Sequence, residues 1–395
     1  MDSGAAAPLR LAYPSGRYGS PRVTPLTLRA VLVFGRMDNL AHTLVGAALG
    51  RALAGHRLRG AALLGAVAAN APDWTELIIN PGVVPPRSGL RYVVWHRGIT
   101  HSFAGAAAEI ACLTLLGWVV ARWWASRTRT PAPSWPWVAA CVAAAVASHL
   151  YLDWQGSYGL RPFLPWSGRW YYGDWVAIVD PFFWLVPLGA LLWGERRHWW
   201  PALVGLLTLT GIALIVFLAR GASVAAWLRV VTGVLCLVTA LGWERHWFGV
   251  AGRRRAAAYA LLALAGYAAA SGAASLPAKA GAREAAQQRF GPEAEWAALT
   301  IVGRPFRWQP IYASRDSVAG PGWATPRHLA LPVVQRVLRD TPEGRAMAQF
   351  ARFLAADVDS SGSGVMVYLR DARYARGPRG GWAAVAVSAA GLSAP

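Results

Sequence analysis

Long apolar runs separated by short polar segments dominate the first 275 residues of the chain. An alanine-rich run covers residues 256–275, and two shorter runs cover about 40–54 and 60–71. Five further runs approach or reach the roughly 20 apolar residues that a spanning helix needs: residues 103–125, 137–152, 175–193, 199–219 and 222–243. The pattern predicts a mainly α, polytopic membrane bundle of six to eight helices, with the two shorter segments either spanning or partly inserted.

The pattern changes after Leu276, where charged residues return. Residues 297–316 and 364–388 predict β-rich pieces, and residues 331–358 between them predict helix. We therefore expect a tail at 1–36, a membrane helical domain with the metal site at 37–275 and a soluble α+β domain at 276–395. The tail lacks the apolar core of a secretory signal, and Met37, which opens the patterned sequence, is a candidate start codon.

Composition agrees with a membrane protein, because 55% of the 395 residues are hydrophobic and only 15% are charged. The net charge of +20 raises the question of nucleic acid, but the arginines lie between apolar runs rather than on a soluble face, which disfavours that partner. If the helices alternate, twelve arginines fall in one set of loops and six in the opposite short loops. This bias predicts that the first set is cytoplasmic and that the C-terminal domain is extracytoplasmic.

The same alternation places the unusual polar residues at one membrane face. Ionisable residues at membrane depth are costly, so a functional role is the default hypothesis for them. The residues concerned are His42, Asp73, His96, His101, His149, Asp153, Asp174 and Asp180.

Spacing within this set points to metal binding. His149 and Asp153 are four residues apart, which places both on one face of a helix. In "HRGITH" the step from His96 to His101 crosses a glycine, which suits a loop that folds both imidazoles toward one point. Imidazole and carboxylate together favour zinc or a similar first-row ion over magnesium or calcium. The candidate ligands of one or two divalent ions are His42, Asp73, His96, His101, His149 and Asp153.

Each of these residues also has a structural interpretation when taken alone. A single His42 in an apolar helix is more often a packing residue, and Asp73 after a proline is equally a turn or cap residue. Asp180 is typical of a helix cap ahead of Pro181. Thr100 and Ser102 are predicted caps of the helix that follows, and the three cysteines are typical packing residues. Taken together at one membrane face, however, the polar residues favour metal ligation.

Five segments in order carry a resemblance: "MDNLAHTLVGAALG", "APDWTE", "HRGITHS", "SHLYLDWQGSYGLRPFLPWSGRWYYGDW" and "VDPFFW". They resemble the YdjM-like family of bacterial inner-membrane-bound metal-dependent hydrolases, also labelled LexA-binding. The likeness is close over residues 37–195 and looser beyond. It implies a multi-pass protein of the bacterial inner membrane whose six candidate ligands fall on the family's motif positions. Where the family often has a second aspartate, this chain has Thr75, followed by Glu76.

The leading hypothesis is hydrolysis of a lipid-linked ester or phosphoester by metal-activated water at the membrane surface. Glu76 or Asp174 would accept the proton, and Arg97 would stabilise an oxyanion or a phosphate. The alternative is a non-catalytic membrane scaffold or regulatory protein, in which the polar cluster stabilises helix packing and the outer domain binds a protein partner. A transporter is less favoured, because it predicts helix interruptions near the midplane. DNA binding ranks last.

Overall fold

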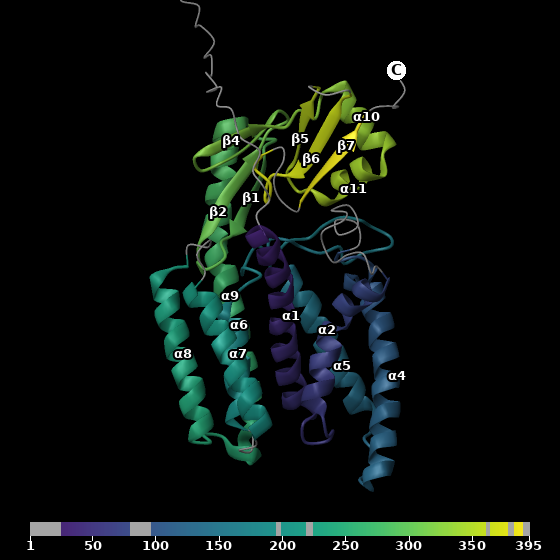
Figure 1. Cartoon of the computed structure of the whole chain (residues 1–395), viewed down its shortest axis with the longest axis vertical. Helices are drawn as coiled ribbons and strands as arrows, with labels where there is room; N and C mark the ends of the chain where they lie inside the picture. Colours follow the sequence, from purple (N-terminus) through teal and green to yellow (C-terminus); the bar gives the residue numbers. More distant parts are fainter. Residues whose placement is uncertain are drawn as a thin grey trace, which may run out of the picture.

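The computed structural model describes residues 25–79, 96–194, 199–218, 224–360, 364–377 and 383–389. For residues 25–38, 75–79 and 199–202 it describes the backbone but not the side chains. The helices form one elongated bundle, and an α+β domain stands on one end of it (Figure 1).

The bundle explains the long apolar runs of the sequence. Its helices are α1 (Pro25–Ala54), α2 (Ala61–Ile79), α4 (Phe103–Thr128), α5 (Trp135–Trp154), α6 (Pro181–Trp193), α7 (Trp199–Leu218), α8 (Ala226–Glu244) and α9 (Gly249–Phe290), with the short 3-10 helix η1 (Ile99–His101) before α4. Among the described residues, α4, α5, α8 and α9 are long and apolar enough to cross a membrane, and α6 and Leu203–Leu218 are shorter apolar helices. The predicted membrane helix bundle is confirmed, whereas the number of helices that cross stays a prediction.

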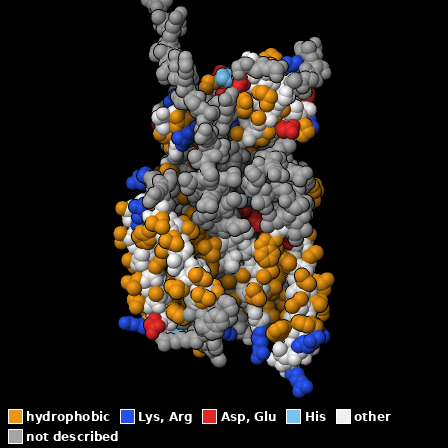
Figure 2. Space-filling model, in the orientation of Figure 1, with side chains coloured by type: hydrophobic (Ala, Val, Ile, Leu, Met, Phe, Trp, Pro, Cys, Tyr) orange, Lys and Arg blue, Asp and Glu red, His pale blue; other side chains and the backbone are white. Residues whose placement is uncertain are grey.

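The outer surface of the bundle is apolar, as a lipid-facing surface must be (Figure 2). On α4, Leu115, Leu116, Val119 and Val120 are 49–62% exposed, which would be a large apolar patch on a soluble protein. Lys and Arg side chains stand at the lower tips of the helices in Figure 2, the end farther from the α+β domain.

Two helices run past the predicted domain boundaries. Helix α1 begins at Pro25, inside the segment that we expected to be a tail, and continues through Met37. Proline at a first helical position has a preset φ and loses no hydrogen bond, so it is a good start. Helix α9 continues past residue 275 to Phe290, because the added residues are largely good helix formers. It ends at Gly291, whose φ of 91° suits glycine.

The C-terminal domain contains two antiparallel sheets. The first has the order β1-β2-β3-β4, and the second has the order β5-β6-β7. The bounds are β1 (Glu295–Thr300), β2 (Trp308–Ala313), β3 (Ser317–Gly320), β4 (Trp323–Pro326), β5 (Leu354–Asp359), β6 (Met366–Asp371) and β7 (Ala384–Ser388), with α10 (Pro332–Asp340) and α11 (Pro342–Phe350) between the sheets in sequence. The predicted α+β class of this domain is confirmed.

Within this domain, the predicted helical piece 331–358 is wrong at its end. Helix α11 stops at Phe350, and Leu354–Asp359 forms β5, paired with β6 from Leu354 opposite Asp371 to Asp359 opposite Met366. Tertiary pairing outweighs local helix propensity here, because every residue of this edge strand lies opposite a residue of β6 and its first three residues are buried.

The loop between α5 and α6 ties the two parts of the molecule together. Tyr158 of this loop is buried in the apolar core of the C-terminal domain, where its ring centroid lies 5.6 Å from that of Phe350. Arg373 Nη1 donates to the carbonyl oxygen of Ser157 at 2.7 Å, and the Thr300 backbone N–H donates to Ser157 Oγ at 3.0 Å. The domain therefore fixes the loop that leads out of α5.

Candidate metal centre

Close contact between α1 and α2 brings two of the predicted ligands together. A Cβ added to Gly46 would overlap the carbonyl oxygen of Gly65, and a Cβ added to Gly65 would overlap that of Gly46. Only glycine allows two helix backbones to approach so closely. His42 lies one turn before Gly46, and Asp73 lies two turns after Gly65, so both stand at the same end of this contact.

Helix α5 supplies two more ligands from one face. Cys141, Ala145, His149 and Asp153 recur every four residues, and all four are buried. The Cys141 thiol lies 3.5 Å from the carbonyl oxygen of Ala61 in α2, so the apolar part of this face packs on the helix pair just described. The polar part, one to two turns farther along, faces His42 and Asp73. Helix α5 therefore places His149 and Asp153 on one face, as predicted.

The "HRGITH" loop contributes one of its two imidazoles. His101 is fully buried at the end of η1, and its Nδ1 lies 3.1 Å from Thr100 Oγ1. Ser102 is the cap of α4, since its Oγ accepts from the backbone N–H of Gly105 at 3.1 Å, whereas Thr100 faces the histidine instead. The ring of His96 is half-buried, and its centroid lies 6.4 Å from that of His101.

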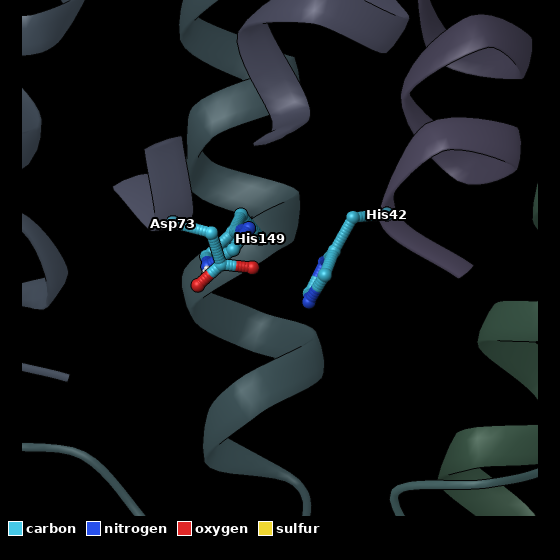
Figure 3. A group of neighbouring side chains, drawn as sticks. All are labelled: His42, Asp73 and His149. Atoms are coloured by element: carbon cyan, nitrogen blue, oxygen red, sulfur yellow. Dashed lines mark ion pairs between the residues drawn. The ribbon is translucent and has the colours of Figure 1, made fainter. Parts of the chain in front are cut away.

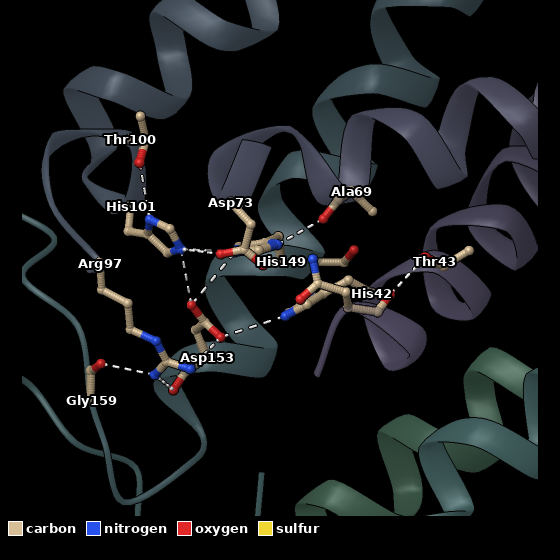
Figure 4. A network of polar contacts seen from close by, with 12 residues as sticks. His42, Thr43, Ala69, Asp73, Arg97, Thr100, His101, His149, Asp153 and Gly159 are labelled. Atoms are coloured by element: carbon tan, nitrogen blue, oxygen red, sulfur yellow. Dashed lines mark hydrogen bonds and ion pairs between the residues drawn. The ribbon is translucent and has the colours of Figure 1, made fainter. Parts of the chain in front are cut away.

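Four side chains from α2, η1 and α5 bring donor atoms close together around Nε2 of His101 and Nε2 of His149 (Figure 4). Nε2 of His101 lies 3.0 Å from Nε2 of His149 and 3.3 Å from Oδ1 of Asp73. It lies 3.3 Å from Oδ2 of Asp153 as well. Nε2 of His149 lies 3.8 Å from the same Asp73 oxygen and 3.5 Å from the same Asp153 oxygen.

These separations fit the coordination shell of a small tetrahedral ion. Ligand atoms bound at about 2.0–2.1 Å in a tetrahedral zinc site lie roughly 3.4 Å from one another. The five separations above span 3.0–3.8 Å, on both sides of that value. Two imidazoles and two carboxylates also match zinc in donor type and balance the charge of a divalent ion. The residues therefore fit a small divalent metal ion.

His42 extends the group on its far side. Its ring stacks on that of His149, with centroids 3.9 Å apart and an interplanar angle of 23°, and its Nε2 lies 3.5 Å from Oδ1 of Asp153. Figure 3 shows His42 reaching from its own helix toward Asp73 and His149. Two overlapping sets of three, His101–His149–Asp153 and His42–Asp73–His149, have the spacing to hold an ion. His149 belongs to both sets but can ligate only one ion at a time through Nε2, so a second ion would depend on His42 and the carboxylates.

A backbone carbonyl orients the shared histidine. Nδ1 of His149 lies 2.7 Å from the carbonyl oxygen of Ala69 in α2. A carbonyl oxygen only accepts, so Nδ1 carries the hydrogen, and the lone pair of neutral His149 lies on Nε2. A hydrogen bond on the far nitrogen is the usual way in which proteins fix a metal-binding imidazole. Nε2 therefore presents its lone pair to the group.

Two polar residues that the sequence did not single out brace the first helix pair. Asn70 of α2 is buried, and its Nδ2 donates to Thr43 Oγ1 at 2.9 Å. Thr43 Oγ1 in turn donates to the carbonyl oxygen of Asn39 at 2.6 Å. Thr43 follows His42 directly, and Asn70 precedes Asp73 by three residues. Their position next to motif residues in otherwise apolar helices is the signal that could have identified them.

Arg97 is directed at a predicted ligand and at the loop after α5. Its Nη2 donates to Oδ1 of Asp153 at 2.6 Å, and its Nη1 donates to the carbonyl oxygens of Asp153 and Gly159, both at 3.0 Å. The guanidinium also lies 4.7 Å above the ring of Tyr158. Arg97 is 2% exposed and has a φ of 54°, a strained value for a residue with a side chain. These contacts make it a positioning group for Asp153.

The structure does not bring Asp174 to the group. Oδ2 of this buried carboxylate accepts from Arg352 Nη1 at 2.9 Å, and its carbonyl oxygen accepts from Trp308 Nε1 at 2.9 Å. Both partners belong to the C-terminal part of the chain. Asp174 is thereby engaged in joining the loop to the α+β domain.

Two further acidic residues remain to be placed. Glu76 lies on α2, about one turn after Asp73, but its side chain is outside the described residues. Asp180 caps α6, as predicted, because its Oδ1 accepts from the backbone N–H of Phe182 at 2.9 Å. Its Oδ2 accepts from the Tyr267 hydroxyl at 2.6 Å, so the cap also binds α9.

Comparison with known proteins gives one family match. The family described as YdjM inner membrane protein matches residues 37–238. This range contains the whole donor group, by which we mean His42, Asp73, His101, His149 and Asp153. No curated protein and no solved structure matches the chain.

Proposed function

The chain belongs to the YdjM inner membrane protein family, and on this premise we propose that it is a metal-dependent hydrolase of the bacterial inner membrane. Its substrate would be a lipid-linked ester or phosphoester. The observation that carries the proposal is the convergence of imidazole and carboxylate donors from residues 42 to 153 at one buried point.

The proposed metal is zinc, as one ion or two. His101, His149, Asp73 and Asp153 would hold the first ion, and His42 with the neighbouring Asp153 carboxylate would offer donors to a second. When bound, such an ion supplies a Lewis acid that activates water at neutral pH.

The role of Arg97 in this proposal is to hold Asp153. The carboxylate is held in one orientation because one oxygen accepts from the guanidinium while the other faces the two histidines. We propose this role in place of direct stabilisation of an oxyanion, since Arg97 donates to Asp153 and to Gly159.

Asp73 marks the side from which water and substrate would enter. Its side chain is 18% exposed, whereas those of the three histidines and Asp153 in the group are 0–2% exposed. Glu76 follows Asp73 by three residues on the same helix. We therefore keep Glu76 as the proposed proton acceptor, and Asp174, engaged with Arg352, is the less favoured candidate.

Exposed aromatic residues beside η1 support a lipid-linked substrate. Phe103 begins α4 and is 58% exposed, and its ring centroid lies 5.5 Å from that of Phe163, which is 43% exposed. Trp166 of the same loop is 79% exposed. Aromatic side chains concentrate at the boundary between lipid headgroups and acyl chains, so this rim suits a molecule that stays anchored in the membrane.

The test is metal content and hydrolysis of the detergent-purified full chain, with His149→Ala against Cys141→Ala. Both variants truncate a buried residue on the same face of α5, but only one removes a donor. Wild type and Cys141→Ala should carry zinc and hydrolyse a phosphodiester or carboxylic ester presented in lipid micelles. His149→Ala should stay folded, lose most of its metal and lose hydrolysis.

Two results would overturn the proposal. Metal-free protein that keeps full hydrolytic activity would exclude the metal mechanism. A folded, metal-free wild type without any hydrolysis, together with a His149→Ala variant that fails to fold, would favour the alternative of a structural polar cluster in a scaffold or regulatory protein.

A further inference from the structure

A second polar feature lies at the opposite end of the bundle from the donor group. A cavity of about 600 Å³ opens between the end of α1 and the beginning of α9. Its volume is in the range of ordinary ligand sites. The residues that line it are Arg51, Ala52, Gly55, His56, Val250, Ala251, Arg253, Arg254, Arg255 and Ala258.

Two of the lining arginines are held by the ends of neighbouring helices. Arg51 Nη1 donates to the carbonyl oxygen of Leu191 near the end of α6 at 2.6 Å. Arg254 Nε donates to the carbonyl oxygen of Ala52 in the last turn of α1 at 2.8 Å. These two bonds hold the guanidinium groups of both arginines in place at the edge of the cavity.

The cavity is strongly electropositive. Four arginines and one histidine line it, and none of the described lining residues is acidic. Partial desolvation lowers the pKa of His56, and the positive charges of Arg254 and Arg57 lower it further. The positive charges that disfavour a further proton on His56 would favour a bound anion. Guanidinium groups match a phosphate best, because their planar fork donates two parallel hydrogen bonds.

The surroundings of the cavity indicate an anion with an apolar body. Val250 lines the cavity and is 41% exposed. Trp247 and Tyr259 flank this part of the chain and are 49% and 59% exposed. Exposed Trp and Tyr at the end of an apolar helix bundle mark the headgroup level of a bilayer. Lys and Arg side chains gather at this same end of the molecule in Figure 2.

We propose that this cavity binds the phosphate of an anionic phospholipid headgroup. The arginines take the phosphate, and the acyl chains lie along the exposed apolar flank of α9. Basic pockets between membrane helices on the cytoplasmic side are suited to such headgroups. The site is separate from the donor group, so it does not depend on the hydrolase proposal.

The competing explanation is that these arginines only cap helix ends and orient the protein in the membrane. Arg51 and Arg254 do make cap contacts, which makes them poor test residues. Arg253 and Arg255 line the same cavity from the first turns of α9, and Arg255 is exposed. The test therefore uses Arg253→Gln/Arg255→Gln, which removes two charges and keeps both side chains long.

A matched control removes two charges at the same end of the molecule. Arg122 and Arg127 lie near the end of α4, away from the cavity lining, where they stack over the rings of Trp118 and Trp123. Arg122→Gln/Arg127→Gln alters net charge by the same amount. Binding of phosphatidylglycerol, phosphatidylcholine and inorganic phosphate to the full chain in neutral detergent is measured by native mass spectrometry and titration.

Phosphatidylglycerol should bind the wild type at least tenfold more tightly than phosphatidylcholine. The Arg253→Gln/Arg255→Gln variant should lose roughly 30-fold in affinity for it, from about two arginine contacts, and the control pair should change by less than about twofold. Should the double variant not fold, Arg255→Gln alone should lose about fivefold.

Three outcomes would overturn the proposal. Equal losses in the two charge-removal variants would show a general surface effect. Equal binding of phosphatidylglycerol and phosphatidylcholine would remove the role of headgroup charge. Inorganic phosphate that binds as tightly as the lipid would assign the cavity to a soluble anion.

Discussion

Nε2 of His101 and Nε2 of His149 lie 3.0 Å apart, although the two residues are 48 positions apart in the chain. The hydrogen bond from Nδ1 of His149 to Ala69 leaves a lone pair on Nε2 of the neutral ring. Two carboxylate oxygens approach the same point. Such a gathering of buried acceptors is stable when a cation occupies the centre, which leads to the first prediction.

Removal of metal should destabilise the protein. At free zinc 100 times its Kd, binding to the folded state contributes about 2.7 kcal/mol, which corresponds to roughly 5–10 °C in Tm. We expect thermal unfolding in detergent to shift down by this order after chelation and to recover with zinc but not with equimolar magnesium. An unchanged Tm after complete chelation would contradict a metal in this site.

Substitution of the residue that holds Asp153 should weaken metal binding without removing a ligand. Lysine at position 97 keeps the charge but cannot reproduce the three hydrogen bonds of Arg97. Arg97→Lys should lower zinc affinity by about 10–100-fold, the usual effect of losing a group that orients a ligand. Arg169→Lys, at an exposed arginine of the loop between α5 and α6, is the control. Equal zinc affinity in the two variants, measured by competition with a chromogenic chelator, would refute the role of Arg97.

The contact between α1 and α2 should be sensitive to a single methyl group. Gly46→Ala places a Cβ against the carbonyl oxygen of Gly65 and should cost about 1–3 kcal/mol. Because the helices must separate, zinc affinity should fall as well. A Cβ at Gly266 in α9 meets nothing within 4 Å, so Gly266→Ala should be neutral or slightly stabilising. Thermal unfolding and metal content of both variants check this, and a harmless Gly46→Ala would show that the close approach is not needed.

Asp174 and Arg352 should behave as a pair. If the ion pair joins the loop to the C-terminal domain, Asp174→Asn and Arg352→Gln should lower Tm to similar extents. The double variant should be less destabilised than their sum, with a coupling of about 1–3 kcal/mol. A catalytic base would give another pattern, in which Asp174→Asn abolishes hydrolysis and Arg352→Gln retains it.

Five of the six candidate ligands come together because they obey local rules, and His96 lies beside them. His149 and Asp153 share a face through their spacing of four, and alternation of the apolar helices places His42 and Asp73 at the same end. What these rules cannot supply is the partner of a buried charge. Arg97 bonds to Gly159, 62 residues away, and Asp174 meets an arginine 178 residues away. Those contacts decide the roles of both residues, and they exist only after the chain has packed.

The same limit applies to the fold. Apolar runs located the helices, but the end of α9 depends on Gly291 rather than on the end of an apolar run. Residues Leu354–Asp359 have a composition that suits a helix, and they became a strand because β6 lies beside them. Gly46 and Gly65 were visible as glycines, yet their importance rests on facing one another.

Helix α9 has 42 residues, so at 1.5 Å per residue it is about 63 Å long, roughly twice the hydrocarbon thickness of a bilayer. One continuous helix therefore sets both the distance of the α+β domain from the lipid and its rotation about the helix axis. A single residue inserted near Gly281 would turn everything beyond it by about 100°. The domain would then present a different side to the α5–α6 loop, and the angular setting of one helix would decide whether the two halves of the molecule engage.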